Sequence, residues 1–355
     1  MENPSLSFWE NKRVLVTGHS GFKGAWLAMW LKVLGAEVVG ISLKPETEPN
    51  LFTLANVDHV CYKSYFADIR HLDEIQKIID DTQPEVAFHL AAQALVREGY
   101  RHPHLTFSSN IMGTVNVLEA LRECPTVQSI VAITTDKVYE NKEWPWPYRE
   151  NDVLGGKDPY SASKSACEMV IKSYRDSFFN EASIGLASAR AGNVIGGGDW
   201  AHERLLPDAI RAWLNNETLF IRNPQAVRPW QHVLEPLCGY LILAERLYEN
   251  ADLAGAYNFG PSAQNNACVL DVLDIAQKFF PDALFAIDNP DPNMPEAKLL
   301  ALDTYRANAA LNVYSRWNLE ESLRYTCQWY QKAHQNPKEA LKLCLNDIAT
   351  FTMKE

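Results

Sequence analysis

The sequence has few cysteines, and none of them are paired at a redox or metal-binding spacing. Its seven cysteines are scattered over 355 residues without a Cys-x-x-Cys motif. An odd number of dispersed thiols does not fit a disulfide framework, so we expect reduced cysteines and a cytoplasmic protein. His102 and His104 lack a third ligand at a useful spacing, so the sequence predicts no metal site.

Long hydrophobic runs and an excess of positive charge are also missing. The apolar stretch 237–248 is interrupted by Glu245 and Arg246, so no segment predicts a membrane-spanning helix. The formal net charge of −11 argues against a nucleic-acid-binding surface. The first residues are polar and acidic, unlike a signal peptide. The length and the 47% hydrophobic content fit an enzyme with one large or two moderate domains.

A glycine-rich turn lies between a predicted strand and a predicted helix near the start of the chain. Residues 14–17 predict a strand, residues 25–34 a helix, and residues 37–41 a second strand. Between the first strand and the helix, Gly18, Gly21 and Gly24 lack the Cβ atoms that would block close backbone approach. This β-α-β unit predicts a dinucleotide whose pyrophosphate lies at the helix N-terminus. A tight turn without a ligand is the alternative.

Strands and helices continue to alternate through the first half of the chain. Strands are predicted at residues 63–67, 86–90, 129–134 and 184–189, and helices at 72–81, 105–122 and 159–179. This alternation predicts an α/β fold with a Rossmann-type, doubly wound parallel sheet that binds ligands at the carboxyl ends of its strands. After residue 191 the elements become short and mixed. We expect a dinucleotide-binding domain of residues 1–190, to which 231–260 return, and a smaller mixed α/β substrate-binding domain of 191–230 and 261–355.

Tyr160 and Lys164 are four residues apart on a predicted helix and therefore share one face. A phenol is a poor base at neutral pH because its pKa is about 10, but a nearby cation favours the phenolate. The pair can remove a hydroxyl proton when a hydride acceptor is present. Taken alone, it also fits an ordinary surface helix, and the glycine turn is what favours chemistry.

Five motifs resemble the extended short-chain dehydrogenase/reductase superfamily in kind and in order. They are Thr17-Gly18-x-x-Gly21-x-x-Gly24, His89-Leu90-Ala91-Ala92, Asn110-x-x-Gly113-Thr114, Thr134-Thr135-Asp136 and Tyr160-x-x-x-Lys164. Thr135-Asp136 is similar to the nucleotide-sugar 4,6-dehydratases of that superfamily. Residues 18–24, 135–139 and 197–208 most resemble the members of this branch that act on CDP-glucose.

The resemblance implies a hydro-lyase that needs NAD and regenerates it in every cycle. Tyr160 would take the proton of the 4-hydroxyl, Thr135 would bond to the 4-oxygen, and Lys164 would hold the nicotinamide ribose and lower the tyrosine pKa. Asp136 would be the acid that protonates the departing 6-hydroxyl, kept protonated by burial. The 4-keto-6-deoxy product would serve deoxysugar and O-antigen lipopolysaccharide biosynthesis.

Lys137 departs from the usual pattern, in which a Glu after the Asp removes the proton on carbon 5. A neutral Lys can act as this base if desolvation lowers its pKa. Otherwise Lys137 supports the enolate as a cation and another group removes the proton. The sequence leaves the two possibilities open.

The cofactor site implied by the resemblance draws on several strand ends. His19 and Lys23 can add positive charge near the pyrophosphate, with an ordinary turn residue and a solvated lysine as the alternatives. Ser42 follows the second strand, where no acidic residue holds the ribose and Lys44 is compatible with a 2′-phosphate, so NAD over NADP rests on the resemblance. Asp68 matches an adenine-contacting Asp, with a helix N-cap as the alternative. The expected cofactor contacts are Gly18, His19, Gly21, Phe22, Lys23, Gly24, Ser42, Asp68, Ile69, Leu90, Ala91, Ala92, Tyr160 and Lys164.

The diphosphate of a sugar nucleotide needs arginine and amide donors. Arg228 matches the pyrophosphate-binding Arg of the family, Asn193 matches a diphosphate-contacting Asn, and Arg204 is a further candidate. The resemblance also implies a homodimer or homotetramer in which helices 105–122 and 159–179 pack against those of a partner.

Two other functions remain open on the sequence. A 4-epimerase of the same fold shares Tyr160 and Lys164, but it needs no acid for water loss, so Asp136 argues against it. A non-catalytic regulator that senses NAD needs the glycine turn but not the Tyr-Lys pair.

Overall fold

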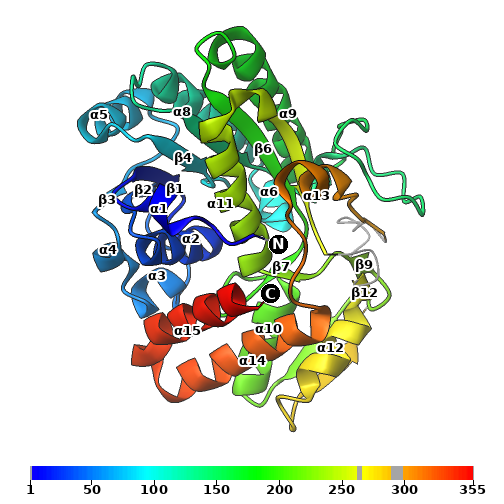
Figure 1. Ribbon diagram of the computed structural model, residues 1–355. Helices are drawn as coiled ribbons and strands as arrows, with labels where there is room; N and C mark the ends of the chain where they lie inside the picture. Colours follow the sequence, from blue (N-terminus) through cyan, green and yellow to red (C-terminus); the bar gives the residue numbers. More distant parts are fainter. Residues whose placement is uncertain (1, 262–265, 289–298, 355) are drawn as a thin grey trace.

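A seven-stranded parallel sheet forms the centre of the computed structural model, which describes residues 2–261, 266–288 and 299–354 (Figure 1). The strand order is β11-β6-β5-β4-β1-β2-β3. The strands are β1 (Arg13–Thr17), β2 (Glu37–Ser42), β3 (Lys63–Phe66), β4 (Val86–His89), β5 (Ser129–Ile133), β6 (Gly185–Ala191) and β11 (Gly255–Phe259). Thr17 pairs with both Ile41 and His89, so three carboxyl ends lie side by side. The predicted doubly wound sheet is confirmed.

Alternating residues of the buried strands divide the core into two layers. In β1, Val14 and Val16 face one layer and Leu15 faces the other. The first layer lies under α2 (Phe22–Val33) and α11 (Leu234–Glu249), and the second lies under α5 (Leu72–Thr82), α8 (Gly113–Arg122) and α9 (Pro159–Tyr174). Both faces are covered, as a parallel sheet of β-branched and aliphatic residues requires.

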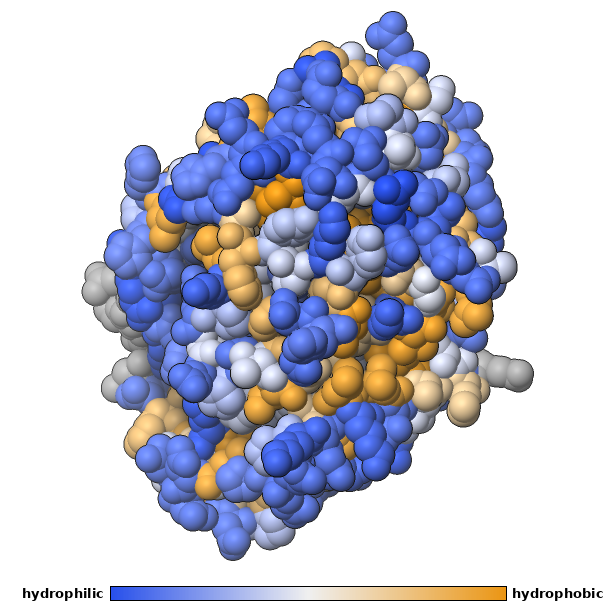
Figure 2. All heavy atoms as spheres, turned by 90° about the vertical axis from the view of Figure 1, so that its left-hand side faces the viewer, coloured by the Kyte–Doolittle hydropathy of each residue, from blue (hydrophilic) through white to orange (hydrophobic). Residues whose placement is uncertain are grey.

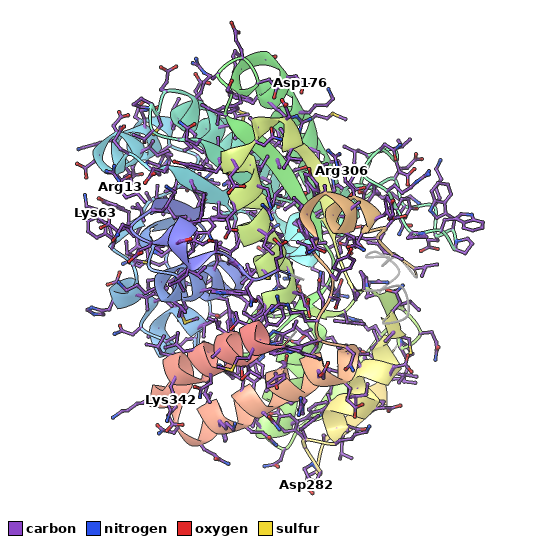
Figure 3. All side chains as sticks on the ribbon, in the orientation of Figure 1. Arg13, Lys63, Asp176, Asp282, Arg306 and Lys342 are labelled. Atoms are coloured by element: carbon purple, nitrogen blue, oxygen red, sulfur yellow. The ribbon has the colours of Figure 1, made fainter. Side chains whose placement is uncertain are left out.

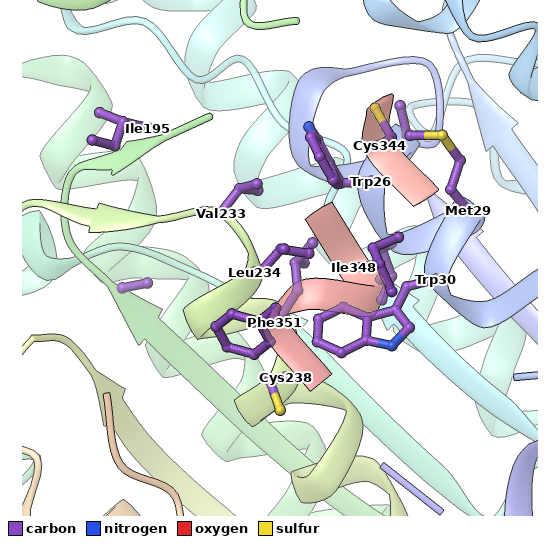
Figure 4. Packing of buried hydrophobic residues seen from close by; sticks show 14 of the residues in the cluster. Trp26, Met29, Trp30, Ile195, Val233, Leu234, Cys238, Cys344, Ile348 and Phe351 are labelled. Atoms are coloured by element: carbon purple, nitrogen blue, oxygen red, sulfur yellow. The ribbon is translucent and has the colours of Figure 1, made fainter. Parts of the chain in front are cut away.

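The C-terminal helices α14 (Leu319–Gln335) and α15 (Ala340–Met353) close the first layer from below in Figure 1. Figure 4 shows Trp30 of α2 beside Phe351 of α15, and the ring centroids are 5.7 Å apart in an edge-to-face arrangement. The two chain ends meet there, because Asn3 Nδ2 donates to the Thr352 carbonyl at 3.0 Å.

Shorter elements extend beyond the sheet. Three strand pairs join β7 (Val194–Ile195) to β10 (Gln231–His232), β9 (Val227–Arg228) to β12 (Ala267–Cys268), and β8 (Thr218–Ile221) to β13 (Leu284–Ile287). The remaining α-helices are α1 (Leu6–Trp9), α3 (Leu51–Leu54), α4 (Val57–Val60), α6 (Val96–Arg101), α7 (Pro103–Phe107), α10 (Leu205–Leu214), α12 (Val269–Gln277) and α13 (Tyr305–Leu311).

The surface is mixed in polarity. Charged side chains such as Arg13, Lys63 and Asp176 lie around the outside of the molecule (Figure 3). Figure 2 turns the β3 side toward the viewer and shows hydrophobic residues among hydrophilic ones, and Phe66 at the end of β3 is 47% exposed. Within the described ranges, no helix is both long enough and apolar enough to cross a membrane.

The helix predicted over 105–122 differs from the structure in one respect. It is divided into α7, a π-helical turn (Ser108–Met112) and α8. The buried Asn110 side chain lies at this turn, where Nδ2 donates to the Gln93 carbonyl at 3.0 Å and to Ser163 Oγ at 2.8 Å. Likewise α9 ends at Tyr174 and continues as a π-helical turn to Phe179. Hydrophobic periodicity does not reveal one extra residue in a turn, so the sequence predicts continuous helices.

Candidate active site

The glycine turn packs so closely that two of its glycines cannot carry a side chain. A Cβ on Gly18, whose φ is +80°, would lie 2.8 Å from the Ala91 amide nitrogen, and one on Gly24 would lie 2.1 Å from the Gly18 carbonyl oxygen. A Cβ on Gly21 would meet the same oxygen at 3.4 Å, which is an ordinary contact. Since Gly21 is the N-cap of α2, the open position faces the helix N-terminus. This arrangement fits a dinucleotide pyrophosphate bound by backbone N–H groups.

His19 does not supply the positive charge that the sequence predicts. Its ring is fully buried, with Nδ1 3.1 Å from Ser42 Oγ and Nε2 2.9 Å from Ser64 Oγ. Burial lowers the pKa of His19 to about 4, so the ring is neutral at physiological pH. The Ser42 hydroxyl also accepts a hydrogen bond from the Ser20 amide at 3.3 Å. His19 and Ser42 therefore brace the glycine turn against β2 and β3.

Lys23 lies among the charged groups of the catalytic motifs. Its side chain is half-buried at the start of α2. Burial lowers its pKa to about 7, with further lowering by Arg204 and, more weakly, by Lys164, while the charge of Asp136 opposes the shift. The Lys23 amine therefore loses its proton more readily than that of an exposed lysine, and its charge toward a pyrophosphate stays a prediction.

The other expected cofactor residues follow neighbouring strands. Asp68 forms an ion pair with Arg70 and accepts the Arg70 amide at 2.9 Å, and these bonds lower its pKa. The N-cap of α5 is His71, so the alternative role of Asp68 as that cap is wrong. Ile69 packs against Gly113, where a Cβ would come within 2.4 Å of it.

Three more expected residues lie around the turn. The Leu90 amide donates to the Thr17 carbonyl at 3.1 Å, and the Ala91 amide donates to the Thr17 hydroxyl at 3.1 Å. These two hydrogen bonds lead residues 90–92 past the glycine turn. On the helix side, Phe22 lies against Gly196, where a Cβ would be 3.1 Å from its ring.

A chain of buried hydrogen bonds that the sequence does not predict links the carboxyl ends of β1 and β4 to α8 and the π-helical turn before it. Thr17 Oγ1 lies 2.7 Å from His89 Nδ1, His89 Nε2 lies 3.1 Å from Thr114 Oγ1, and Thr114 donates to the Asn110 carbonyl at 2.6 Å. Burial lowers the pKa of His89 to about 3, so this ring is neutral. The signal in the sequence is that all four residues of this chain belong to three of the quoted motifs.

Thr135, Asp136 and Lys137 follow β5 and form a compact group. Asp136 is fully buried, and its Oδ1 accepts bonds from Thr135 Oγ1 at 3.0 Å and from Lys137 Nζ at 3.2 Å. Among the described residues, Asp136 Oδ2 has no hydrogen-bond partner. A buried acceptor without a partner is costly, so this oxygen is the point at which a ligand can donate a hydrogen bond to Asp136 or, when the carboxyl group is protonated, take a proton from it.

Tyr160 and Lys164 face the same space from α9. Burial raises the pKa of Tyr160 to about 12, against a hydrogen bond with Thr135, while the charge of Asp136 adds to the rise and Arg204 opposes it. Lys164 Nζ donates to the Ile133 carbonyl at 3.2 Å, and burial lowers its pKa. The cation whose charge lowers the tyrosine pKa here is Arg204, in place of the expected Lys164, and desolvation outweighs its effect.

The expected substrate residues Asn193 and Arg228 are the sequence neighbours of Gly192 and Pro229, which pack together beside Asp136. A Cβ on Gly192 would lie 3.1 Å from Asp136 Oδ2 and 2.5 Å from Pro229, so the ends of β6 and β9 meet at the acid. Asn193 Oδ1 is buried beside them without a partner among the described residues. Arg228 is buried, and its Nη1 donates to the Val227 carbonyl.

Arg204 approaches from another loop. Its Nη1 donates to the buried Asp199 Oδ2 at 2.8 Å, and its charge acts on both Tyr160 and Lys23. The structure therefore brings this candidate to the catalytic pair.

Residues 15–250 match the family described as GDP-mannose 4,6 dehydratase. The matched residues include the glycine turn, the Thr-Asp-Lys group after β5 and the Tyr-Lys pair of α9. The chain belongs to this family of nucleotide-sugar dehydratases.

A more specific similarity lies within that family. The chain is 46% identical over 333 residues to the CDP-glucose 4,6-dehydratase of Salmonella typhimurium, and the alignment covers 92% of each protein. Solved structures with the same fold include a UDP-glucuronic acid 4-epimerase of Bacillus cereus in complex with UDP-glucuronic acid and NAD. Its TM-score is 0.78 at 22% identity, over 90% of this chain and 99% of that one. An NAD-dependent NDP-hexosamine 5,6-dehydratase of tunicamycin biosynthesis has a TM-score of 0.77 at 24% identity, over 91% and 98%.

Proposed function

We propose that this protein is a hydro-lyase that converts CDP-glucose to CDP-4-keto-6-deoxyglucose with NAD as its cofactor. The observation that carries the proposal is the buried Asp136, whose Oδ1 is held by Thr135 and Lys137 and whose Oδ2 has no partner among the described residues. An epimerase needs no such acid. The 46% sequence identity to a CDP-glucose 4,6-dehydratase, over 92% of the chain, supports CDP as the nucleotide and glucose as the sugar of the substrate.

The proposed reaction needs two proton transfers, one from the 4-hydroxyl during oxidation and one to the departing 6-hydroxyl during water loss. The glycine turn of Gly18, Gly21 and Gly24 would hold NAD, which would supply the hydride acceptor for carbon 4 and, once reduced, the hydride for carbon 6. Tyr160 removes the proton of the 4-hydroxyl. Thr135, whose hydroxyl donates to Asp136 Oδ1 in this structure, would turn that proton toward the 4-oxygen of the substrate. Because burial holds the tyrosine pKa at about 12, the cations Arg204 and Lys164 are needed to stabilise the phenolate.

Water loss requires the second group. The 4-ketone acidifies the proton on carbon 5, and Asp136 protonates the departing 6-hydroxyl through Oδ2. Lys137 donates to the other oxygen of Asp136, so we assign it the cationic role, in which it stabilises the enolate while another basic group takes the proton from carbon 5. Of the two roles that the sequence leaves open for Lys137, base or stabilising cation, we thus propose the cation.

The remaining site residues follow from their positions. Gly18, Gly21 and Gly24 admit the pyrophosphate of NAD, with Phe22, Lys23 and residues 90–92 beside it, and His19 and Ser42 support the turn. Asp68 and Ile69 border the adenine. Asn193, Arg204 and Arg228 bind the diphosphate of CDP-glucose.

The proposal assigns the two ligands to two parts of the chain. Residues 1–190 with 231–260 bind NAD, and residues 191–230 with 261–355 bind the sugar nucleotide. The division is supported by β11 and α11, which join the seven-stranded sheet and its first core layer. A cytoplasmic enzyme of deoxysugar and lipopolysaccharide biosynthesis fits this activity.

We further propose assembly as a homodimer or homotetramer through α8, α9 and the segment before α8. Met112, Met169 and Phe178 are exposed apolar side chains on these elements, and Met169 is 62% exposed. Large exposed apolar groups on adjacent helices are typical of subunit contacts.

Incubation with sugar nucleotides and NAD tests the function. We expect a 4-keto-6-deoxy product from CDP-glucose without net formation of NADH, and little product from the dTDP, GDP and UDP sugars. Product from a different nucleotide would correct the substrate, and a 4-epimer without loss of water would overturn the dehydratase assignment.

A further inference from the structure

The catalytic groups come from two elements that are distant in sequence, and three contacts hold these elements together. Lys164 Nζ bonds to the Ile133 carbonyl at 3.2 Å, Ser165 Oγ to the Val138 carbonyl at 2.7 Å, and Thr134 Oγ1 to Glu168 Oε1 at 2.5 Å. All three join α9 to the segment that carries Thr135 and Asp136. Only the third involves a carboxylate.

Glu168 belongs to a buried ion pair that the proposed mechanism does not use. Its Oε2 accepts hydrogen bonds from Arg190 Nη2 at 2.8 Å and from Ser188 Oγ at 2.7 Å. Only 4% of the Glu168 side chain and 4% of the Arg190 side chain are exposed. Burial acts to raise the pKa of Glu168, but Arg190 and the hydroxyl donors outweigh it, and the net pKa is lowered. The carboxylate is therefore ionised. Its charge also favours the ammonium form of Lys164, one turn earlier on α9.

Arg190 extends the contact toward β11. Its Nη1 donates to Tyr139 Oη at 2.9 Å and to the Glu150 carbonyl at 3.0 Å. Tyr139 Oη in turn donates to Asn258 Oδ1 at 2.7 Å, on β11. Tyr139 lies directly after the turn of Asp136 and Lys137, so the network holds that turn on both sides.

We propose that the Glu168–Arg190 ion pair is a positioning device for the reaction, which fixes the strand end of Thr135 and Asp136 against the helix face of Tyr160 and Lys164. The inference rests on the dehydratase function proposed above. Oxidation and elimination act on one sugar in turn, so both pairs of groups must keep a fixed separation. A displacement of about 1 Å in such a site costs on the order of a hundredfold in rate.

Two matched substitutions separate positioning from stability. Thr134→Val and Ser188→Ala each remove one hydroxyl donor from Glu168, but only Thr134 belongs to the strand end that leads to Thr135. We expect similar falls in the thermal unfolding midpoint. We expect Thr134→Val to lower kcat by about tenfold while KM changes by less than about threefold, and Ser188→Ala to leave kcat near the wild-type value. Equal effects on kcat would overturn the proposal.

The charged pair gives a second test. Glu168→Gln leaves a buried arginine without its partner and should be unstable, whereas Glu168→Gln with Arg190→Met removes both charges. We expect the double variant to regain much of the lost unfolding midpoint and still to turn over on the order of ten- to a hundredfold more slowly, with reduced nicotinamide accumulating during turnover. Glu245→Gln is the control, because this buried carboxylate bonds to Ser5 and Trp9 instead.

The outcomes are distinct. Recovery of wild-type kcat together with stability in the double variant would show a purely structural ion pair and would contradict the inference. If the wild-type protein forms no 4-keto product from CDP-glucose, the proposed function itself is wrong. Wild-type turnover with equal activity in Thr134→Val and Ser188→Ala rejects the positioning role alone.

Discussion

Asp136 Oδ1 accepts a hydrogen bond from the Lys137 ammonium at 3.2 Å, while its Oδ2 is buried beside Gly192 without a partner among the described residues. The two oxygens of one carboxyl group therefore have different surroundings. Oδ1 is held by Thr135 and Lys137, and Oδ2 is left to face the substrate. Because Oδ1 can accept these hydrogen bonds whether the group is ionised or neutral, the side chain stays in place while Oδ2 carries or releases the transferable proton.

The role of Lys137 can be separated by charge. Lys137→Arg keeps the cation but cannot supply a neutral base, since the arginine pKa exceeds about 12. We expect it to retain measurable turnover, with Lys137→Met losing roughly a further ten- to a hundredfold. Exchange of the carbon-5 proton with deuterated solvent gives the readout. If Arg and Met variants are equally inactive and both stop the exchange, Lys137 is the base rather than the stabilising cation.

The glycine turn predicts different outcomes at two positions. Gly24→Ala places a Cβ 2.1 Å from the Gly18 carbonyl oxygen, so overpacking should destabilise the fold by about 3 kcal/mol. Gly21→Ala has room within the protein and should leave the unfolding free energy nearly unchanged. It should still weaken NAD binding by roughly tenfold, because the added methyl lies where the backbone meets the ligand. Calorimetric titration with NAD measures this, and unchanged affinity in Gly21→Ala would place the dinucleotide elsewhere.

Lys23 predicts a pH-dependent stability. Its pKa is lowered from 10.5 in the unfolded chain to about 7 in the fold, so the unfolded state binds more protons between these values. Its unfavourable contribution is complete below pH 7, diminishes as the pH rises and is gone above about 10.5. Lys23→Met should therefore stabilise the protein at pH 6 by a few kcal/mol, at about 1.4 kcal/mol per pKa unit, and by little at pH 10. Urea unfolding at both pH values tests this, and an equal gain at both would mean that the amine is not desolvated.

The proposed assembly predicts that one exposed methionine matters and another does not. Met169→Glu puts a charge into the α9 contact and should convert the oligomer to smaller species. Met353→Glu, at a side chain that is 80% exposed on α15, is the control. Light scattering at micromolar concentration distinguishes them, and a wild-type monomer would refute the assembly.

The sequence predicts this fold well because its signals are local. Strand patterns, the glycine spacing and the four-residue interval of Tyr160 and Lys164 each lie within one or two elements. The surroundings of individual side chains depend on residues far away in the chain. His19 is neutral because Ser64 and the β2 backbone enclose it, and Asn110 interrupts a helix because Ser163 bonds to it. Burial competes with charge at Tyr160, and only the packed structure shows which effect prevails.

The acid role of Asp136 is the central claim, and single-turnover mixing of Asp136→Asn with CDP-glucose tests it most directly. The substitution removes the transferable proton with almost no change in size. We expect reduced nicotinamide to form and persist, with steady-state turnover lower by about a hundred- to ten-thousandfold, whereas Tyr160→Phe should form none. Formation of the 4-keto-6-deoxy product by Asp136→Asn at the wild-type rate would contradict the account.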